Sequence, residues 1–457
     1  MPSEKRETQQ NIQFVFGIKY QLPEMETSTI CPKMTVTPTR GLVDENIVIV
    51  ISGLSPKQAI TIRSLLNSED KDFWHAYGHY VSDDNGVVNV VEDECLGGTY
   101  NGREPTGLIW SLKPVPGSRP ALRLRKLDVL APFMLNISVY KGHISKCFEE
   151  PPLANAVIER WYIAPGVSRV DVKEKGIRGT LFIPPGPGPF PGILDMWGGG
   201  SSGITEYRSS LLASHGYAVL ALDFLSSQAK SMQSGNITEK YFEAAFEFLQ
   251  SHPRICSDRI SIFGFSFGAS VAVALVANEN SINPRCLVCV SGCHIIQVKN
   301  TIDDAIVGFF RHPGKVKYDE SNHVIWRGLC LPIPTDESEK VKVRNLKCPF
   351  LLIAGSDDQN MAAAESAEDI ENMMKAAGNE HLLTKLVYPM AGHLIDPPYS
   401  PHIRSSNFID SLKNQRVVLL YGGTTKEHCF AQEDSWKKIL DFLHHHLYDA
   451  EIILPKV

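Results

Sequence analysis

The chain has 457 residues, too many for one hydrophobic core of ordinary size, so its length predicts two domains or one domain with a large insertion. Its hydrophobic fraction of 43% and charged fraction of 21% are typical of a globular protein, and exclude a disordered or collagen-like chain. The formal net charge is −6, and no long block of Lys and Arg could attract a phosphate backbone. We therefore expect no nucleic-acid partner.

The sequences of the two chain ends predict flexible tails and bear on the cellular compartment of the protein. Residues 1–33 begin with a polar, Gln-rich stretch without periodicity and predict a flexible tail, as do residues 450–457 at the other end. The start resembles neither a secretory signal nor a transit peptide, and no run of about twenty apolar residues predicts a membrane span. Scattered cysteines indicate a reducing compartment, and we expect a cytoplasmic protein. The final Pro455-Lys456-Val457 keeps the basic middle residue of the Ser-Lys-Leu peroxisomal signal, so a peroxisomal location is the alternative.

Residues 34–165 contain short apolar runs separated by turn signals such as Asp-Asn-Gly and Pro-Gly. Runs of this length and spacing predict an antiparallel β-sandwich. The expected strands cover residues 46–52, 59–65, 75–81, 86–91, 120–125 and 133–140.

Residues 166–449 alternate apolar runs with helix-length periodic segments, a pattern typical of a mostly parallel sheet flanked by helices. An insertion at 294–346 interrupts this alternation, and its residues 315–326 predict a hairpin of the kind that shapes a substrate entrance. The expected strands are 179–183, 192–196, 218–223, 260–264, 286–290, 350–354 and 385–388, and the expected helices are 206–215, 237–251, 267–277, 362–377 and 432–447.

One cysteine cluster superficially resembles a metal site, since Cys286, Cys289 and Cys293 precede His294. However, the stretch that begins at Cys286 has the composition of a buried strand, where Cys behaves as a small apolar residue. No second ligand pair follows at zinc-finger spacing. We therefore expect neither a metal nor another cofactor.

The strongest local motif is Gly264-Phe-Ser266-Phe-Gly268, which lies between a β-rich run and an Ala-rich helical run. This context is the one that a nucleophile elbow requires, because the serine must stand on a strained strand-to-helix turn and the flanking glycines let the neighbouring backbone approach. We expect Ser266 to be a nucleophile. The N–H of Phe267, at the start of the following helix, is expected to donate to an oxyanion.

A serine needs a base and an orienting acid, which follow in the order Asp or Glu, then His, in this type of fold. His393 lies in the loop just after the strand 385–388, and it is the expected base. Asp357 and Asp358 both follow the strand 350–354. We expect Asp358 to be the acid because it has the Gly-x-x-Asp spacing usual in this fold, and Asp357 is the alternative.

A second oxyanion donor is expected from the loop after the strand 192–196, which carries Gly198, Gly199 and Gly200 in succession. Glycines without side chains let backbone N–H groups face a nucleophile. The pattern does not distinguish which of the three N–H groups donates.

Long, specific segments over nearly the whole chain resemble the type-I acyl-CoA thioesterases and the bile acid-CoA:amino acid N-acyltransferases. The matching segments are residues 97–112, 181–196, 206–213, the elbow, and 392–399. The family pattern places its nucleophile, acid and base on Ser266, Asp358 and His393. The resemblance implies a fatty or bile acyl group on coenzyme A as the substrate, so that coenzyme A is part of the substrate and no separate cofactor is needed.

Within this family the nucleophile separates two chemistries. Members that transfer the acyl group to glycine or taurine look to have Cys at the elbow. The hydrolases have Ser there, and this chain resembles them in having Ser266. An acyl ester on Ser is less electrophilic than a thioester on Cys, so an amine competes less well with water. The expected function is therefore hydrolysis of fatty acyl-CoA, with N-acyl transfer as the alternative.

There are two further hypotheses for the function. One is a carboxylesterase or peptidase of the same fold, and the other is a non-catalytic family member that binds a partner. The sequence departs from the family pattern at residues 222–230 and at Gln359-Asn360. The sequence is compatible with a monomer and with a small homo-oligomer.

Overall fold

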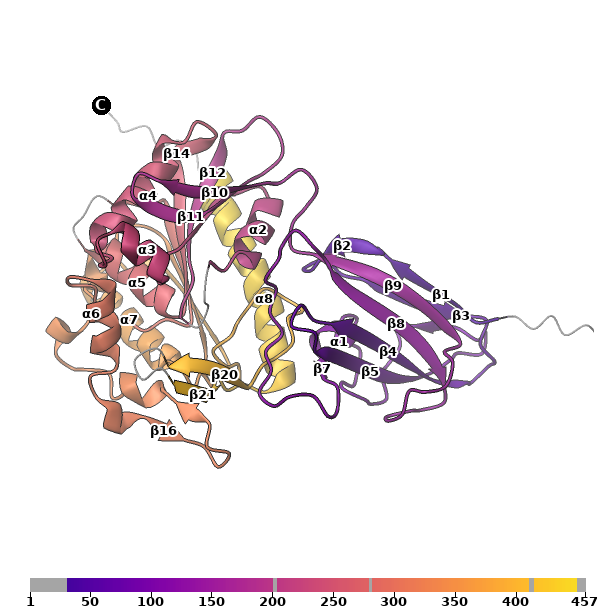
Figure 1. Cartoon of the computed structure of the whole chain (residues 1–457). Helices are drawn as coiled ribbons and strands as arrows, with labels where there is room; N and C mark the ends of the chain where they lie inside the picture. The colour runs from indigo at the N-terminus through magenta and orange to yellow at the C-terminus, as the bar shows by residue number, and fades with distance from the viewer. Residues whose placement is uncertain (1–30, 200–203, 279–281, 411–414, 450–457) are drawn as a thin grey trace, which may run out of the picture.

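The computed structural model describes residues 31–199, 204–278, 282–410 and 415–449. Figure 1 shows two regions side by side, an all-β region built from the first part of the chain and a larger region with a central sheet and helices. The expected tails at 1–30 and 450–457, together with Pro455-Lys456-Val457 and Gly200, lie outside the described residues.

The N-terminal region is a β-sandwich of two sheets, as the sequence predicted. Neighbouring strands are antiparallel apart from the parallel pair β2–β9, and the long strands bury alternate residues, which places one face of each sheet in the core. A short helix, α1 (Gly107–Trp110), packs against β4 and β5. One sheet has the order β1 (Lys33–Thr37), β3 (Val48–Ser52), β6 (Val88–Asn89), and the other has β2 (Arg40–Leu42), β9 (Ala154–Trp161), β8 (Phe133–Lys141), β4 (Ala59–Asn67), β5 (Phe73–Val81), β7 (Lys113–Pro114).

One strand predicted for this region was wrong. Residues 120–125, expected to form a strand, have no regular secondary structure. The alternating apolar residues Leu122 and Leu124 pack on the core without belonging to a strand. The carbonyl of Ala121 accepts a hydrogen bond from the N–H of Asn407 in the second region. The strand β1 begins at Lys33, and the division between a tail at 1–33 and a domain from 34 stays a prediction.

The second region is built on an eight-stranded, mostly parallel sheet, which confirms the α/β fold class. The N-terminal strands β10 and β11 pair antiparallel, and β11 pairs antiparallel with β13. The strand order is β10 (Ser168–Glu174), β11 (Ile177–Ile183), β13 (Ala218–Leu222), β12 (Phe190–Met196), β14 (Ile255–Phe265), β15 (Cys286–Val290), β18 (Phe350–Gly355), β19 (Leu383–Tyr388). Since β9 ends at Trp161 and β10 begins at Ser168, the domain boundary predicted near residue 165 falls between the two regions, and the division of the chain at that residue stays a prediction.

Helices cover both faces of this sheet (Figure 1). On the face turned toward the sandwich lie α2 (Tyr207–Ser214) and α8 (Thr425–His444), which continues as a π-turn at His445–Asp449. On the other face lie α3 (Ser227–Met232), α4 (Glu239–Ser251), α5 (Phe267–Ala277), α6 (Ile302–Phe309) and α7 (Ala363–Ala377). The final helix therefore begins seven residues before the predicted 432, because polar residues in its first turns hid its periodicity.

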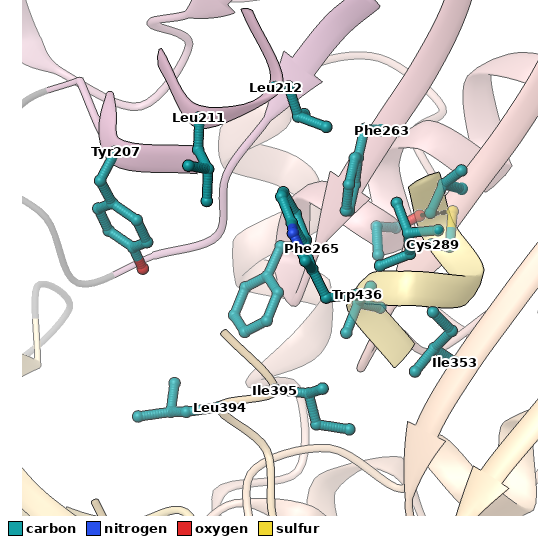
Figure 2. Packing of buried hydrophobic residues seen from close by; sticks show 14 of the residues in the cluster. Tyr207, Leu211, Leu212, Phe263, Phe265, Cys289, Ile353, Leu394, Ile395 and Trp436 are labelled. Atoms are coloured by element: carbon teal, nitrogen blue, oxygen red, sulfur yellow. Dashed lines mark hydrogen bonds between the residues drawn. The ribbon is translucent and has the colours of Figure 1, made fainter. Parts of the chain in front are cut away.

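The core between the sheet and the sandwich-facing helices holds large apolar side chains from distant parts of the sequence (Figure 2). In β14, Phe263 and Phe265 point to the same face because strand side chains alternate, and both meet α2 there. Figure 2 also labels Cys289, which points to the opposite face of the sheet, where its Sγ donates to the Ala269 carbonyl of α5. The other labelled residues are Tyr207, Leu211, Leu212, Phe263, Phe265, Ile353, Leu394, Ile395 and Trp436.

The insertion at 294–346 forms the predicted hairpin, with β16 (Lys317–Tyr318) and β17 (Val324–Ile325) antiparallel. This hairpin belongs to a separate four-stranded sheet together with β20 (Ser405–Asp410) and β21 (Gln415–Leu420). These two strands were not predicted from the sequence. Within the described ranges, no helix is both long and apolar enough to cross a membrane.

Candidate active site

The Gly-x-Ser-x-Gly motif forms the turn between β14 and α5, as predicted. Ser266 has φ of 57° and ψ of −125°, a combination that costs an L-residue about 1–3 kcal/mol and is seen where function requires it. The flanking glycines permit this turn: a Cβ on Gly268 would overlap the carbonyl of Met196, and one on Gly264 would overlap Ala269 in the first turn of α5. The turn holds the Ser266 hydroxyl at the carboxyl end of β14.

Three predicted residues meet at this edge of the sheet. Ser266 Oγ lies 2.8 Å from His393 Nε2, and His393 Nδ1 lies 2.7 Å from Asp358 Oδ2. The three residues are 8%, 2% and 0% exposed, respectively, so bulk water screens these contacts poorly. Because Asp358 accepts a hydrogen bond from Nδ1–H, the neutral imidazole has its lone pair at Nε2, where it can accept the serine proton.

The two adjacent aspartates have different surroundings. Asp358 Oδ1 accepts the backbone N–H groups of Asn360 and Met361, both at 2.8 Å, which leaves Oδ2 for His393. Asp357 instead accepts from the Gln359 side chain at 2.6 Å and from the Gly423 N–H at 2.7 Å. The geometry therefore agrees with Asp358 as the acid partner, and Asp357 supports the neighbouring loop.

The glycine loop after β12 lies against Ser266. A Cβ built on Gly198 would stand 2.6 Å from Ser266 Cβ and 2.9 Å from its Oγ, whereas one on Gly199 would meet nothing within 4 Å. Only a glycine fits at 198 without displacing the serine. Phe267, whose N–H is the other predicted donor, is the first residue of α5, where backbone N–H groups lack intrahelical acceptors.

A buried ion pair supports this loop from below. Arg208 on α2 donates to Asp195 on β12, and Ser209 Oγ donates to the same carboxylate at 2.5 Å. The Arg208 guanidinium also lies 4.6 Å from the ring centroid of Trp197, which stacks on Phe265 at 4.4 Å. These two rings belong to the residues directly before Gly198 and Ser266, so the ion pair and the stack fix both sides of the site.

One contact on the loop that carries Asp358 was not predicted from the sequence. Arg327 of the insertion donates to the carbonyl of Asp358 at 2.8 Å and pairs with Glu365 at the start of α7. The backbone N–H groups of Trp326 and Arg327 both donate to the Gln359 carbonyl. Nothing in the local sequence indicated this, because the two segments meet only when the insertion folds back over the sheet.

The cysteine cluster has no metal-like geometry. Cys286 and Cys289 lie three residues apart in β15 and so face opposite sides of the sheet, and burial raises the pKa of the Cys286 thiol to about 12. His294 is instead bonded to Ser366 and Asp369, at 2.6 Å each. In the described part of the chain, no three His, Cys, Asp or Glu side chains are grouped to hold a metal ion.

Comparison with known proteins places the chain in a family. The family model "BAAT / Acyl-CoA thioester hydrolase C terminal" matches residues 237–449, and "Acyl-CoA thioester hydrolase/BAAT N-terminal region" matches residues 44–174. A third model, "Esterase FrsA-like", matches residues 166–304, which include the elbow.

Three curated mouse (Mus musculus) proteins are similar over most of their length. Acyl-coenzyme A thioesterase 1 is 36% identical over 417 residues, covering 89% of this chain and 95% of the relative. Peroxisomal succinyl-coenzyme A thioesterase is 35% identical, covering 91% and 96%. Bile acid-CoA:amino acid N-acyltransferase is 33% identical, covering 91% and 98%. The chain therefore belongs to the acyl-CoA thioester hydrolase and bile acid-CoA:amino acid N-acyltransferase family of α/β-hydrolase-fold enzymes.

Proposed function

We propose that this protein hydrolyses fatty acyl-CoA to a free fatty acid and coenzyme A through an acyl-serine intermediate. The observation that carries the proposal is the hydrogen-bonded series from Ser266 through His393 to Asp358 in a chain of this family. Such a series activates a serine toward a carbonyl, and in the mouse relatives named as thioesterases the carbonyl belongs to an acyl-CoA.

Each step follows from the positions of these atoms. His393 Nε2 takes the Ser266 proton as Oγ attacks the thioester carbonyl carbon, and the imidazolium that forms is stabilised by Asp358. When the tetrahedral intermediate collapses, the C–S bond breaks and His393 returns the proton to the thiolate of coenzyme A. A water molecule then loses a proton to His393 and attacks the acyl ester. When the second tetrahedral intermediate collapses, the bond to Oγ breaks, His393 returns the proton to Oγ, and the fatty acid is released.

The negative oxygen of each tetrahedral intermediate needs donors on the side opposite the base. We assign this role to the N–H of Phe267 and to the N–H of Gly198 or Gly199. The position of Phe267 at the N-terminus of α5 supports the first donor, because the helix dipole adds a partial positive charge there. The contact of Gly198 with the serine side chain favours it over Gly199 for the second.

Ser at the elbow favours water over an amine as acceptor, and the acyltransferase relative makes amino acid conjugation the alternative outcome. The decisive experiment is a panel of acyl-CoAs of different chain length, assayed by thiol release and by mass spectrometry of the products, with and without glycine and taurine. We expect free acid in every reaction and no thiol release by Ser266→Ala. An N-acyl product in excess of free acid would replace hydrolysis by transfer, and equal thiol release by the Ala variant would remove the acyl-serine mechanism.

Three further assignments go with this function. The substrate is acyl-CoA, so coenzyme A is part of the substrate and not a separate cofactor. We assign residues 34–165 to a sandwich domain and 166–449 to the catalytic domain. We keep the cytoplasm as the proposed location and the peroxisome as its alternative, which is supported by the peroxisomal relative.

A further inference from the structure

His428 lies directly behind the loop that carries His393. It is on the first turn of α8, 1% exposed, and its backbone N–H donates to the Thr424 carbonyl, so the side chain projects from a fixed helical position. Its ring makes two hydrogen bonds. Nδ1 lies 3.0 Å from the Gly392 N–H, and Nε2 lies 2.7 Å from the Leu394 carbonyl oxygen.

These two bonds fix the tautomer of the ring. The Gly392 N–H can only donate, so Nδ1 must carry a lone pair, and the Leu394 oxygen can only accept, so Nε2 must carry the proton. Only the neutral imidazole protonated at Nε2 satisfies both partners. Burial and the nearby His402 lower the pKa of His428 to about 3, so the ring keeps this form over the whole range in which esterases work.

The two partners flank the proposed base in the sequence. Gly392 is the residue before His393 and Leu394 is the residue after it, so one side chain holds the peptide groups on both sides of the base. A third bond, from the His393 N–H to the Tyr421 carbonyl at 2.9 Å, leaves the loop little freedom to rotate. A loop with no regular secondary structure is otherwise a poor support for an imidazole that must face two partners at once.

We propose that His428 is a positioning residue that clamps the backbone on both sides of His393 and thereby holds its imidazole in line with Ser266 and Asp358. The proposal rests on the proposed function, in which His393 is the base. His428 does not touch the reacting atoms, since both of its ring nitrogens are engaged by backbone groups.

Three substitutions at 428 separate the two bonds. His428→Phe removes both and keeps an aromatic ring of similar size. His428→Asn retains an oxygen where Nδ1 stands and can still accept the Gly392 N–H, whereas His428→Gln retains an amide N–H near the Nε2 position and can still donate to Leu394. The Leu394 oxygen also accepts from Gln432 at 3.4 Å, while the Gly392 N–H has no second acceptor in the described part of the chain. Asn should therefore rescue more activity than Gln.

The expected result is a fall in kcat of about 100-fold for His428→Phe, because a displacement of about 1 Å at a catalytic group has an effect of this size. KM for the acyl-CoA should change less than about threefold, because the substrate does not contact His428. The order of kcat should be wild type, Asn, Gln, Phe. Since a buried donor left without a partner also destabilises the fold, all values are measured on full-length protein shown to be folded by circular dichroism.

The matched control is Leu443→Ala, a buried position on the same helix far from the loop. It should lower the melting temperature while leaving kcat unchanged. A kcat for folded His428→Phe within about threefold of wild type would overturn the proposal, as would Asn and Gln variants no better than Phe, or an equal loss of kcat in Leu443→Ala.

A second readout separates this proposal from the proposed function. The rate at which a fluorophosphonate probe phosphonylates Ser266 depends on the same base and not on the acyl-CoA, so it should follow the same order of variants. If wild type hydrolysed no acyl-CoA yet the phosphonylation order held, the thioesterase function would fail and the clamp would stand. If wild type hydrolysed acyl-CoA and phosphonylation were equal in all variants, the clamp would fail alone.

Discussion

Replacing Asp358 by Asn tests the proposal that this buried carboxylate sets the tautomer of His393. In the structure Asp358 Oδ1 accepts two backbone N–H groups, at Asn360 and Met361, and Oδ2 accepts from His393 Nδ1. An Asn side chain has one oxygen, and the two backbone donors require it at the Oδ1 position. Its amide NH₂ must then face His393, which forces Nδ1 to accept and places the imidazole proton on Nε2.

The consequence for the reaction is large, because Nε2 can no longer accept the Ser266 proton. Wrong-tautomer variants of Ser-His-Asp enzymes lose about 10⁴-fold in kcat, which corresponds to about 5 kcal/mol of transition-state stabilisation. We expect a loss of this size in Asp358→Asn, measured as thiol release from acyl-CoA, with little change in KM because the side chain does not contact the substrate. Folding should be preserved, since the two backbone bonds remain.

Asp357→Asn is the matched control, one residue away. Its carboxylate bonds the Gln359 side chain and the Gly423 N–H and does not contact His393 in the described structure, so kcat should fall less than about threefold. A loss below tenfold in Asp358→Asn would refute the tautomer argument. A larger loss in Asp357→Asn than in Asp358→Asn would show that the acid had been assigned to the wrong neighbour.

Three further predictions concern the support of the site and the pH dependence of stability. Gly198→Ala should lower kcat/KM by about 100-fold, because the added methyl group would displace Ser266. Gly199→Ala has open space around its Cβ, so its kcat/KM should stay within about threefold of wild type. Circular dichroism would establish that both variants fold. Arg208→Ala leaves a buried carboxylate without its partner and should reduce the free energy of unfolding in urea by about 3–5 kcal/mol; a loss below about 1 kcal/mol would contradict this. Hydrogen bonds from His294 and Lys340 lower the pKa of Asp369 to about 2. The ionised carboxylate therefore stabilises the fold at pH values above about 3.9, the pKa of Asp in the unfolded chain, and this stabilisation is lost as the pH falls toward 2. Urea midpoints of wild type and Asp369→Asn should therefore differ near about pH 6 and converge at low pH, and a difference that stayed constant with pH would count against the argument.

The elements that the sequence predicted well are those whose signal is local. The elbow could be predicted because the strand, the strained turn and the helix are consecutive in the sequence. The parallel sheet could be predicted because each of its strands has its own apolar run. The segment 120–125 shows the opposite case: its apolar residues alternate, but Leu122 and Leu124 pack on the core from a segment that does not pair in a sheet. The strands β20 and β21 were missed because they pair with each other and with the insertion and not with the main sheet.

The sequence by itself determined the fold class, the chain order of the three site residues and the expected chemistry of a serine nucleophile. Those properties depend on residue types and on spacing along the chain, and they need no knowledge of distant contacts. Only the tertiary structure decided which of two adjacent aspartates faces His393, because both follow the same strand and differ only in the direction of the side chain. It also decided that Arg327 and His428, far from the motif in sequence, reach the loops of the acid and the base. Such contacts form between segments that the fold brings together, and no local pattern encodes them.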